Sequence, residues 1–210
     1  MMENSRIKEK STLIKKRRRK NKLLKIAIAV SILLVLVLVV VGIIISKKTF
    51  KTTESAVYVN GRQQILCASF EKLDKEYYKA DDLKQYVESQ IDLYNGNKNE
   101  KAIKMTSFKQ EGKKIKLFLH YTNSKVYEEF NGQDFFVGTI KEAKAKGYKL
   151  PKDAPSNKEY KIVIMEEKIG VKVAGDIVYT SDNVKKVNDS TVTMKDKTDQ
   201  DTAFIMVIYK

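Results

Sequence analysis

Residues 26–45, IAIAVSILLVLVLVVVGIII, form a run of 20 residues without a single charge. As an α-helix with a rise of about 1.5 Å per residue, the run spans roughly 30 Å, which is the hydrocarbon thickness of a bilayer. Its many β-branched residues favour a strand in water, but in lipid only a helix satisfies its own backbone hydrogen bonds. The run is longer than the apolar part of a cleaved signal peptide, and no small-residue cleavage site follows it. We therefore predict an uncleaved, single-pass transmembrane helix.

The charged flanks of this run predict its orientation. Residues 1–25 contain 11 Lys and Arg against two acids, whereas only three lysines follow the run closely. The positive-inside rule places such a basic segment in the cytoplasm, where it also attracts anionic lipid headgroups. We expect a basic cytoplasmic tail over 1–25, a juxtamembrane linker over 46–55 and an extracytoplasmic domain over 56–210 of a cell-membrane protein.

The composition excludes several kinds of site. One Cys and one His cannot form an internal disulfide or a Cys/His zinc site, and we predict no cofactor. A net charge of +15 is typical of proteins that bind nucleic acid or an anionic membrane. Lysines outnumber arginines 36 to 5, although arginine is the usual reader of phosphates and bases, so we expect no nucleic-acid partner. An external domain without disulfides suits a bacterium.

The remaining sequence predicts an α+β domain with antiparallel hairpins. Asn60-Gly61 lies between two apolar runs, which is typical of a type I′ hairpin turn. Apolar residues alternate with polar ones over 114–121, as in a half-buried strand. Leu83, Val87, Ile91 and Tyr94 fall on one face of a helix that we expect to end before Gly96.

These patterns lead to a list of expected elements. Helices are expected over 80–95, 123–130 and 139–147, the last opened by a capping box at Thr139 and Glu142. Strands are expected over 56–59, 63–70, 103–109, 114–121, 135–137, 160–166, 169–173, 176–180, 184–187, 191–194 and 203–209. The last is apolar throughout and should be central in a sheet. A loop over 149–159, bracketed by Pro151 and Pro155, leaves open whether the domain has one lobe or two.

One pair of motifs suggests serine chemistry. Ser69-Phe70-Glu71-Lys72 matches S-x-x-K and Ser181-Asp182-Asn183 matches S-D-N, which both occur in penicillin-binding enzymes. The third motif of that set, Lys-Thr-Gly, is missing, because Lys197-Thr198 is followed by Asp199. The nucleophile of these enzymes begins a helix, whereas Ser69 ends a predicted strand. An enzyme that uses Ser69 and Lys72 is therefore the least favoured alternative.

The other reactive side chains favour structural roles. His120 lies on the polar face of a predicted strand, without a nucleophile motif nearby, and we interpret it as a surface residue. Cys67 alternates with apolar residues and is expected to be buried. The acidic pairs, such as Glu128-Glu129, are sequence neighbours that point in different directions. We predict no catalytic residue and no metal ligand.

Charge segregation suggests a docking face. Residues 101–125 contain seven lysines and one acid. Strand alternation puts Lys114, Lys116, Phe118 and His120 on one face, and Lys104 lies on the neighbouring predicted strand. Such a face suits an anionic partner, which could be lipid headgroups, a wall polymer or an acidic protein. The alternative is a solvated sheet face whose lysines oppose aggregation.

The domain also resembles a group of membrane-anchored proteins and lipoproteins of clostridial, Gram-positive bacteria. The resemblance lies in Asp74-Lys75-Glu76-Tyr77-Tyr78, Asp82-Leu83-Lys84 through Tyr94-Asn95, Phe130-Asn131-Gly132, Phe136-Val137-Gly138-Thr139 and Ile208-Tyr209-Lys210. It implies an extracytoplasmic location but no activity and no site residues. Many of these relatives are lipoproteins, so the transmembrane anchor of this chain is a departure from the group.

Together, these observations predict a non-catalytic binding or scaffolding module at the cell envelope, anchored in the bilayer by residues 26–45. Its partner would be an envelope protein or an anionic wall polymer. A component of a division or sporulation assembly is an alternative that rests on the same layout alone.

Overall fold

The computed structural model describes residues 50–75, 79–195 and 204–210. The predicted cytoplasmic tail and the predicted transmembrane helix over 26–45 lie outside these ranges. Within them, no helix is long and apolar enough to cross a membrane. Residues from Phe50 onward form one compact unit, so the loop over 149–159 does not divide the domain into two lobes.

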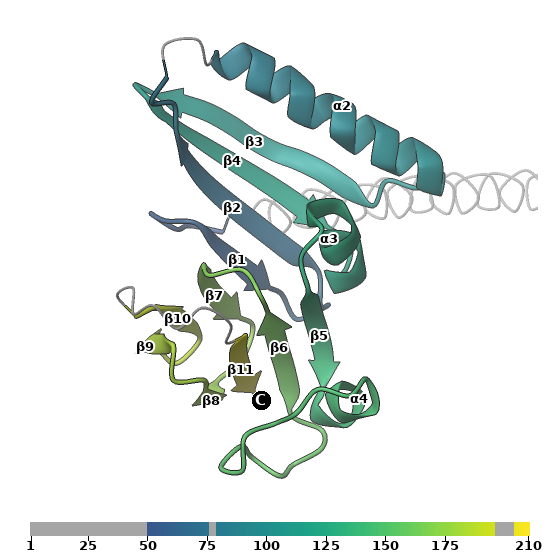
Figure 1. Ribbon diagram of the computed structural model, residues 1–210, viewed down its shortest axis with the longest axis vertical. Coiled ribbons are helices and arrows are strands. Elements are labelled where there is room, and N and C mark those ends of the chain that lie inside the picture. The colour runs from purple at the N-terminus through teal and green to yellow at the C-terminus, as the bar shows by residue number, and fades with distance from the viewer. Residues whose placement is uncertain (1–49, 76–78, 196–203) are drawn as a thin grey trace, which may run out of the picture. The chain divides into compact units, whose positions relative to one another are not determined.

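The described residues of this unit form two sheets and three helices, which is an α+β fold (Figure 1). The first sheet contains β1 (Ala56–Val59), β2 (Ile65–Lys72), β3 (Ile103–Glu111), β4 (Lys114–Tyr121), β7 (Gly170–Val173), β9 (Val184–Asn188) and β10 (Thr191–Met194). The second contains β5 (Phe135–Thr139), β6 (Lys161–Met165), β8 (Ile177–Thr180) and β11 (Ile205–Tyr209). The helices are α2 (Ala80–Lys98), α3 (Ser124–Asn131) and α4 (Ile140–Ala145).

Most strand pairs are antiparallel, as the hairpin signals predict. The seven-stranded sheet has the order β3-β4-β2-β1-β7-β10-β9, and the four-stranded sheet has the order β5-β6-β11-β8. The described strands form one parallel pair, β1 with β7, which places Val57 beside Val171. This pair joins two segments that are more than a hundred residues apart in the chain, so no local sequence pattern predicts it.

The main core contains residues of both sheets. Val57 and Ile65 of the first sheet belong to the same buried cluster as Val163 and Val207 of the second. A smaller cluster joins α4 to the second sheet through Ile140, Ala143, Phe136 and Ile162, among others. All five residues of β11 are buried, and β11 pairs with β6 and β8, which confirms that the last strand is central.

Capping chemistry explains the short helices. The Asn123 side chain accepts a hydrogen bond from the backbone of Val126 at the start of α3, and Gly132 ends that helix in the left-handed region, with φ +66°. Thr139 and Glu142 form the predicted capping box at the start of α4.

The turn at Asn60-Gly61 is wider than the predicted type I′ hairpin. Val59 pairs with Ile65, so five residues connect the strands, and it is Gln63 that has a positive φ, of 60°. The side-chain oxygen of Asn60 accepts hydrogen bonds from the backbone of Arg62 and Gln64. These bonds stabilise a longer loop, and the two-residue prediction is wrong.

Helix α2 also continues beyond its predicted end, through Gly96 to Lys98. Asn99 takes the left-handed conformation instead, with φ 53°, and its backbone N–H binds Asn95 and Gly96 carbonyls. The side chain of Asn95 is engaged with the backbone of Ile103 at the start of β3. A tertiary contact therefore places the end of the helix, and Gly96 is an ordinary helical residue.

Residues 50–55 belong to the folded unit, although we expected a linker over 46–55. Phe50 is buried and stacks on Tyr58, with ring centroids 5.7 Å apart. The hydroxyl of Ser55 accepts a hydrogen bond from the backbone of Phe70. The folded unit therefore begins within five residues of Ile45, the end of the predicted transmembrane helix.

Candidate functional site

The strand register brings the five predicted docking residues onto one face of the seven-stranded sheet. Along β4, Lys114, Lys116, Phe118 and His120 alternate with the inward residues Ile115, Leu117, Leu119 and Tyr121. Lys104 of β3 pairs directly with His120 and so shares its face. Both lysines at the ends of this set, Lys104 and Lys114, are exposed.

Aromatic and aliphatic side chains separate these lysines. Phe70 and Phe118 pack edge to face, with centroids 6.2 Å apart, and the Phe50–Tyr58 stack lies on the same face. A small cluster separate from the main core contains Phe50, Ala56 and Ala68, with Tyr58, Leu66, Phe70 and Phe118 partly buried against it. Among the described residues, no helix contributes a side chain to this cluster.

The positive charge on this face comes from lysines. Lys116 lies over the Phe70 ring, 6.0 Å from its centroid, and Lys172 of β7 lies over the Tyr58 ring at 5.6 Å. Partial burial and the charge of Lys104 lower the pKa of His120, which disfavours its charged form. Glu111 forms an ion pair with Lys116 at one edge. We call this surface, with Lys104, Lys114, Lys116, Lys172, His120 and the aromatic cluster, the lysine–aromatic face.

The opposite face of the same sheet carries a groove that the sequence did not suggest. Helix α2 lies along β3 and β4 in Figure 1 and buries only Ile91, so it covers the sheet incompletely. A cavity of about 530 Å³ lies between α2, the strands β2 and β4, and α3. Tyr86 and Leu93 of α2 line it while remaining exposed, with 62% and 58% of their surface accessible. The apolar spacing of α2 predicts a helix that packs closely against the sheet. Only the tertiary structure shows that a groove remains between them.

The floor of this groove holds several polar groups close together. The Cys67 thiol and the Ser69 hydroxyl are 3.7 Å apart, and the Tyr127 hydroxyl donates to the carboxylate of Glu167. The side-chain amide of Asn131 donates to the Tyr121 hydroxyl at 3.4 Å. Burial raises the pKa of the Cys67 thiol to about 11, so this thiol is neutral and weakly nucleophilic at pH 7.

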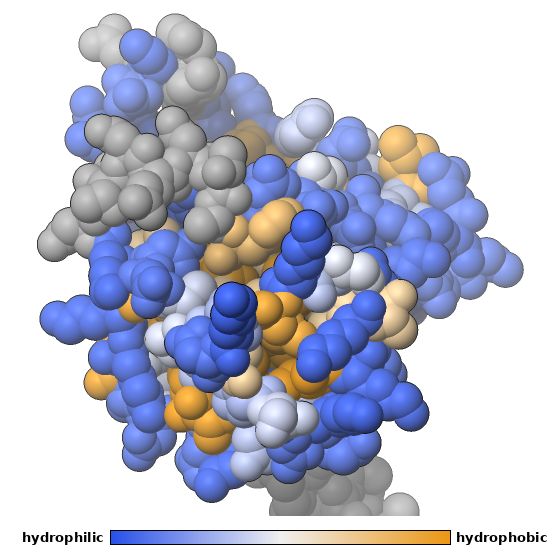
Figure 2. Space-filling model, turned by 60° about the horizontal axis from the view of Figure 1, so that its bottom comes forward, coloured by the Kyte–Doolittle hydropathy of each residue, from blue (hydrophilic) through white to orange (hydrophobic). Residues whose placement is uncertain are grey.

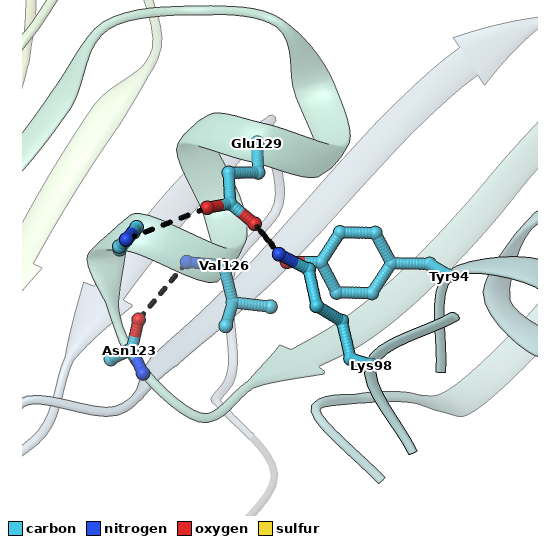
Figure 3. A network of polar contacts seen from close by, with 6 residues as sticks. Tyr94, Lys98, Asn123, Val126 and Glu129 are labelled. Atoms are coloured by element: carbon cyan, nitrogen blue, oxygen red, sulfur yellow. Dashed lines mark hydrogen bonds and ion pairs between the residues drawn. The ribbon is translucent and has the colours of Figure 1, made fainter. Parts of the chain in front are cut away.

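Glu129 closes one end of the groove. It lies on α3 and points toward α2, where the Tyr94 hydroxyl donates to its Oε2 atom at 2.7 Å and Lys98 Nζ lies 2.9 Å from the same atom (Figure 3). These contacts lower the pKa of Glu129, because the positive Lys98 and the donating Tyr94 favour its ionised form. The network joins α2 and α3, which are separated by 25 residues along the chain.

The serine motifs do not come together. Ser69 faces the groove and pairs across β2 and β4 with Leu117, whereas Lys72 is three residues further along the strand and faces the other way. Ser181 donates to Asn183 and accepts from the backbone of Met206, so the S-D-N string holds a turn against β11. The residues 197–199 lie outside the described part of the chain.

The other surfaces of the described residues provide weaker candidates for a functional site. The face at the α4 end, turned forward in Figure 2, is mostly hydrophilic, with hydrophobic side chains gathered in patches between charged ones. Within the described ranges, no group of three or more His, Cys, Asp and Glu side chains could hold a metal ion. The two faces of the seven-stranded sheet are therefore the candidate sites.

No family model matches the chain, and neither a curated protein nor a solved structure is significantly similar to it.

Proposed function

We propose that the chain is a single-pass, membrane-anchored binding module without catalytic activity, held outside the cytoplasm by residues 26–45. Its lysine–aromatic face would lie on the anionic headgroups of the membrane in which it is anchored. The extracytoplasmic location rests on the basic tail over 1–25 and on the resemblance to clostridial membrane-anchored proteins.

The observation that carries this proposal is the position of Phe50. This residue lies in the aromatic cluster of the face, and it follows Ile45 by only five residues. Five residues reach at most about 17 Å, so the chain length keeps this part of the face near the bilayer. Aromatic rings and lysines are the side chains that favour the headgroup region, with about 1 kcal/mol per lysine close to an anionic surface.

This arrangement would also orient the domain. The groove under α2 lies on the other side of the same sheet, so a module resting on its lysine–aromatic face would turn the groove away from the lipid. A wall polymer bound at the same lysines would leave the orientation free. Lipid contact and polymer contact therefore predict different surroundings for Phe118.

A tryptophan reporter can test the proposal, because the chain contains no tryptophan. We expect Phe118→Trp, in the full chain in nanodiscs, to be quenched by brominated lipids when phosphatidylglycerol is present. Tyr86→Trp on exposed α2 serves as the control and should stay unquenched. Adding Lys116→Glu and Lys172→Glu to Phe118→Trp should reduce the quenching.

Equal quenching of the two reporters, or none at Phe118→Trp, would contradict lipid docking. Absence of quenching together with a spectral shift on adding poly(glycerol phosphate) would instead assign the face to a wall polymer.

A further inference from the structure

The groove between α2 and the sheet has the dimensions and polar groups of a ligand site. Its volume of about 530 Å³ lies within the roughly 300–1,000 Å³ that is typical of small-molecule sites. The floor is formed by β2 and β4 together with the inner side chains of α3 and Glu167, one wall by α2, and the other by the rest of α3.

The polar groups of the groove converge at its floor. Ser69, Tyr121, Tyr127 and Asn131 supply hydroxyl and amide groups, and Glu167 supplies a carboxylate. Two further amides, of Gln90 and Asn97, lie on the α2 wall. Hydroxyl and amide groups both donate and accept hydrogen bonds, and a carboxylate accepts them, so all three can bind the hydroxyls of a ligand.

Aromatic surfaces complete the lining. Tyr86 and Tyr94 come from α2 and Phe130 comes from α3, and the Tyr94 and Phe130 rings meet edge to face with centroids 5.8 Å apart. Tyr86 is largely exposed, so its ring is available to cover an apolar face of a bound molecule.

The charge of the groove limits what it can hold. The lining contains two carboxylates, Glu129 and Glu167, and no lysine, arginine or histidine. Glu129 is already paired with Lys98, which leaves the floor with the single carboxylate of Glu167. An anionic ligand would meet repulsion there without a compensating cation, whereas a neutral ligand rich in hydroxyl groups would find partners.

We propose that this groove binds a short stretch of neutral carbohydrate, with a sugar ring against the aromatic wall and its hydroxyls at the polar floor. The site lies on the face opposite to the lysine–aromatic face. It does not depend on lipid docking, because none of its lining residues belongs to that face.

Calorimetric titration of the full chain in nanodiscs tests this proposal without the sugar headgroups of common detergents. The probes are chitotetraose, cellotetraose and maltotetraose, with tri-lysine as a cationic peptide for comparison. We expect at least one oligosaccharide to bind at millimolar concentration and tri-lysine not to bind. The double variant Lys116→Glu, Lys172→Glu should bind the sugar as the wild type does.

Two glutamines of α2 give a matched pair of variants. Gln90→Ala removes a lining amide and should weaken binding about three- to tenfold, as expected for one hydrogen bond. Gln85→Ala changes an exposed glutamine that does not line the groove and should leave the affinity unchanged. Ser69→Leu should fill the floor and abolish binding while circular dichroism stays native.

Absence of binding for all three oligosaccharides would overturn the proposal. It would equally be overturned if Gln90→Ala and Ser69→Leu, each folded, bound sugar as tightly as Gln85→Ala. Binding of tri-lysine without binding of sugar would assign the groove to a cationic peptide instead.

Discussion

Asn95 joins the end of α2 to the sheet, and its removal should destabilise the fold measurably. Its side-chain oxygen accepts from the backbone N–H of Ile103 at 3.0 Å, and its side-chain nitrogen donates to the carbonyl of the same residue at 2.9 Å. Ile103 is 2% exposed, so water cannot easily replace either bond. Asn95→Ala therefore leaves a buried backbone donor and acceptor without these partners.

The magnitude follows from the two bonds and from helix propensity. Each neutral hydrogen bond contributes about 0.5–1.5 kcal/mol net, and buried groups left unsatisfied lie at the upper end of that range. Alanine is a better helix former than asparagine by roughly 0.5 kcal/mol, which offsets part of the loss. We expect the free energy of unfolding to fall by about 2 kcal/mol.

Urea denaturation of the full chain in mild detergent, followed by circular dichroism, measures this change. With a slope of roughly 2 kcal/mol per molar urea, the midpoint should fall by about 1 M. Asn97→Ala, two residues further along the same helix and exposed, is the control and should be neutral or slightly stabilising. Equal midpoints for the two variants would refute the reasoning, because the bonds to Ile103 would then contribute nothing.

Three further predictions concern the remaining structure. Gly175→Ala places a Cβ atom 2.2 Å from the backbone oxygen of Lys210 and should lower the urea midpoint. Gly96→Ala adds a Cβ atom that meets no neighbour within 4 Å, and it should raise the free energy of unfolding by about 0.5–1 kcal/mol because alanine favours the helix. The folded state raises the pKa of the Cys67 thiol from 9.0 to about 11, so the unfolded chain loses this proton at a lower pH than the folded chain does. The urea midpoint should therefore fall as the pH rises from about 9 to about 11, and it should fall less steeply in Cys67→Ala. Thr139→Ala removes the cap of α4 and should cost about 1 kcal/mol by the same assay; an unchanged midpoint would mean that the capping box does not stabilise the helix.

Much of the fold could be read from local patterns. Alternation over 114–121 predicts β4 with its bounds unchanged, and the capping box at Thr139 predicts the start of α4, because both signals are short-range. The two errors at Asn60 and Gly96 have one cause. In each place an asparagine side chain binds backbone atoms and moves the boundary beyond the position that glycine suggests.

The sequence by itself determined the apolar run over 26–45, the asymmetry of its charged flanks, the α+β class and the alternation that gathers the lysines of β4 on one face. These are properties of neighbouring residues, and spacing along the chain suffices to read them. The tertiary structure alone decided that Phe50 joins the lysine–aromatic face, and that α2 leaves a groove floored by Cys67 and Ser69. The physical reason is that a groove depends on how far a helix lies from a sheet. That distance depends on contacts between residues far apart in the chain, such as Tyr94 with Glu129.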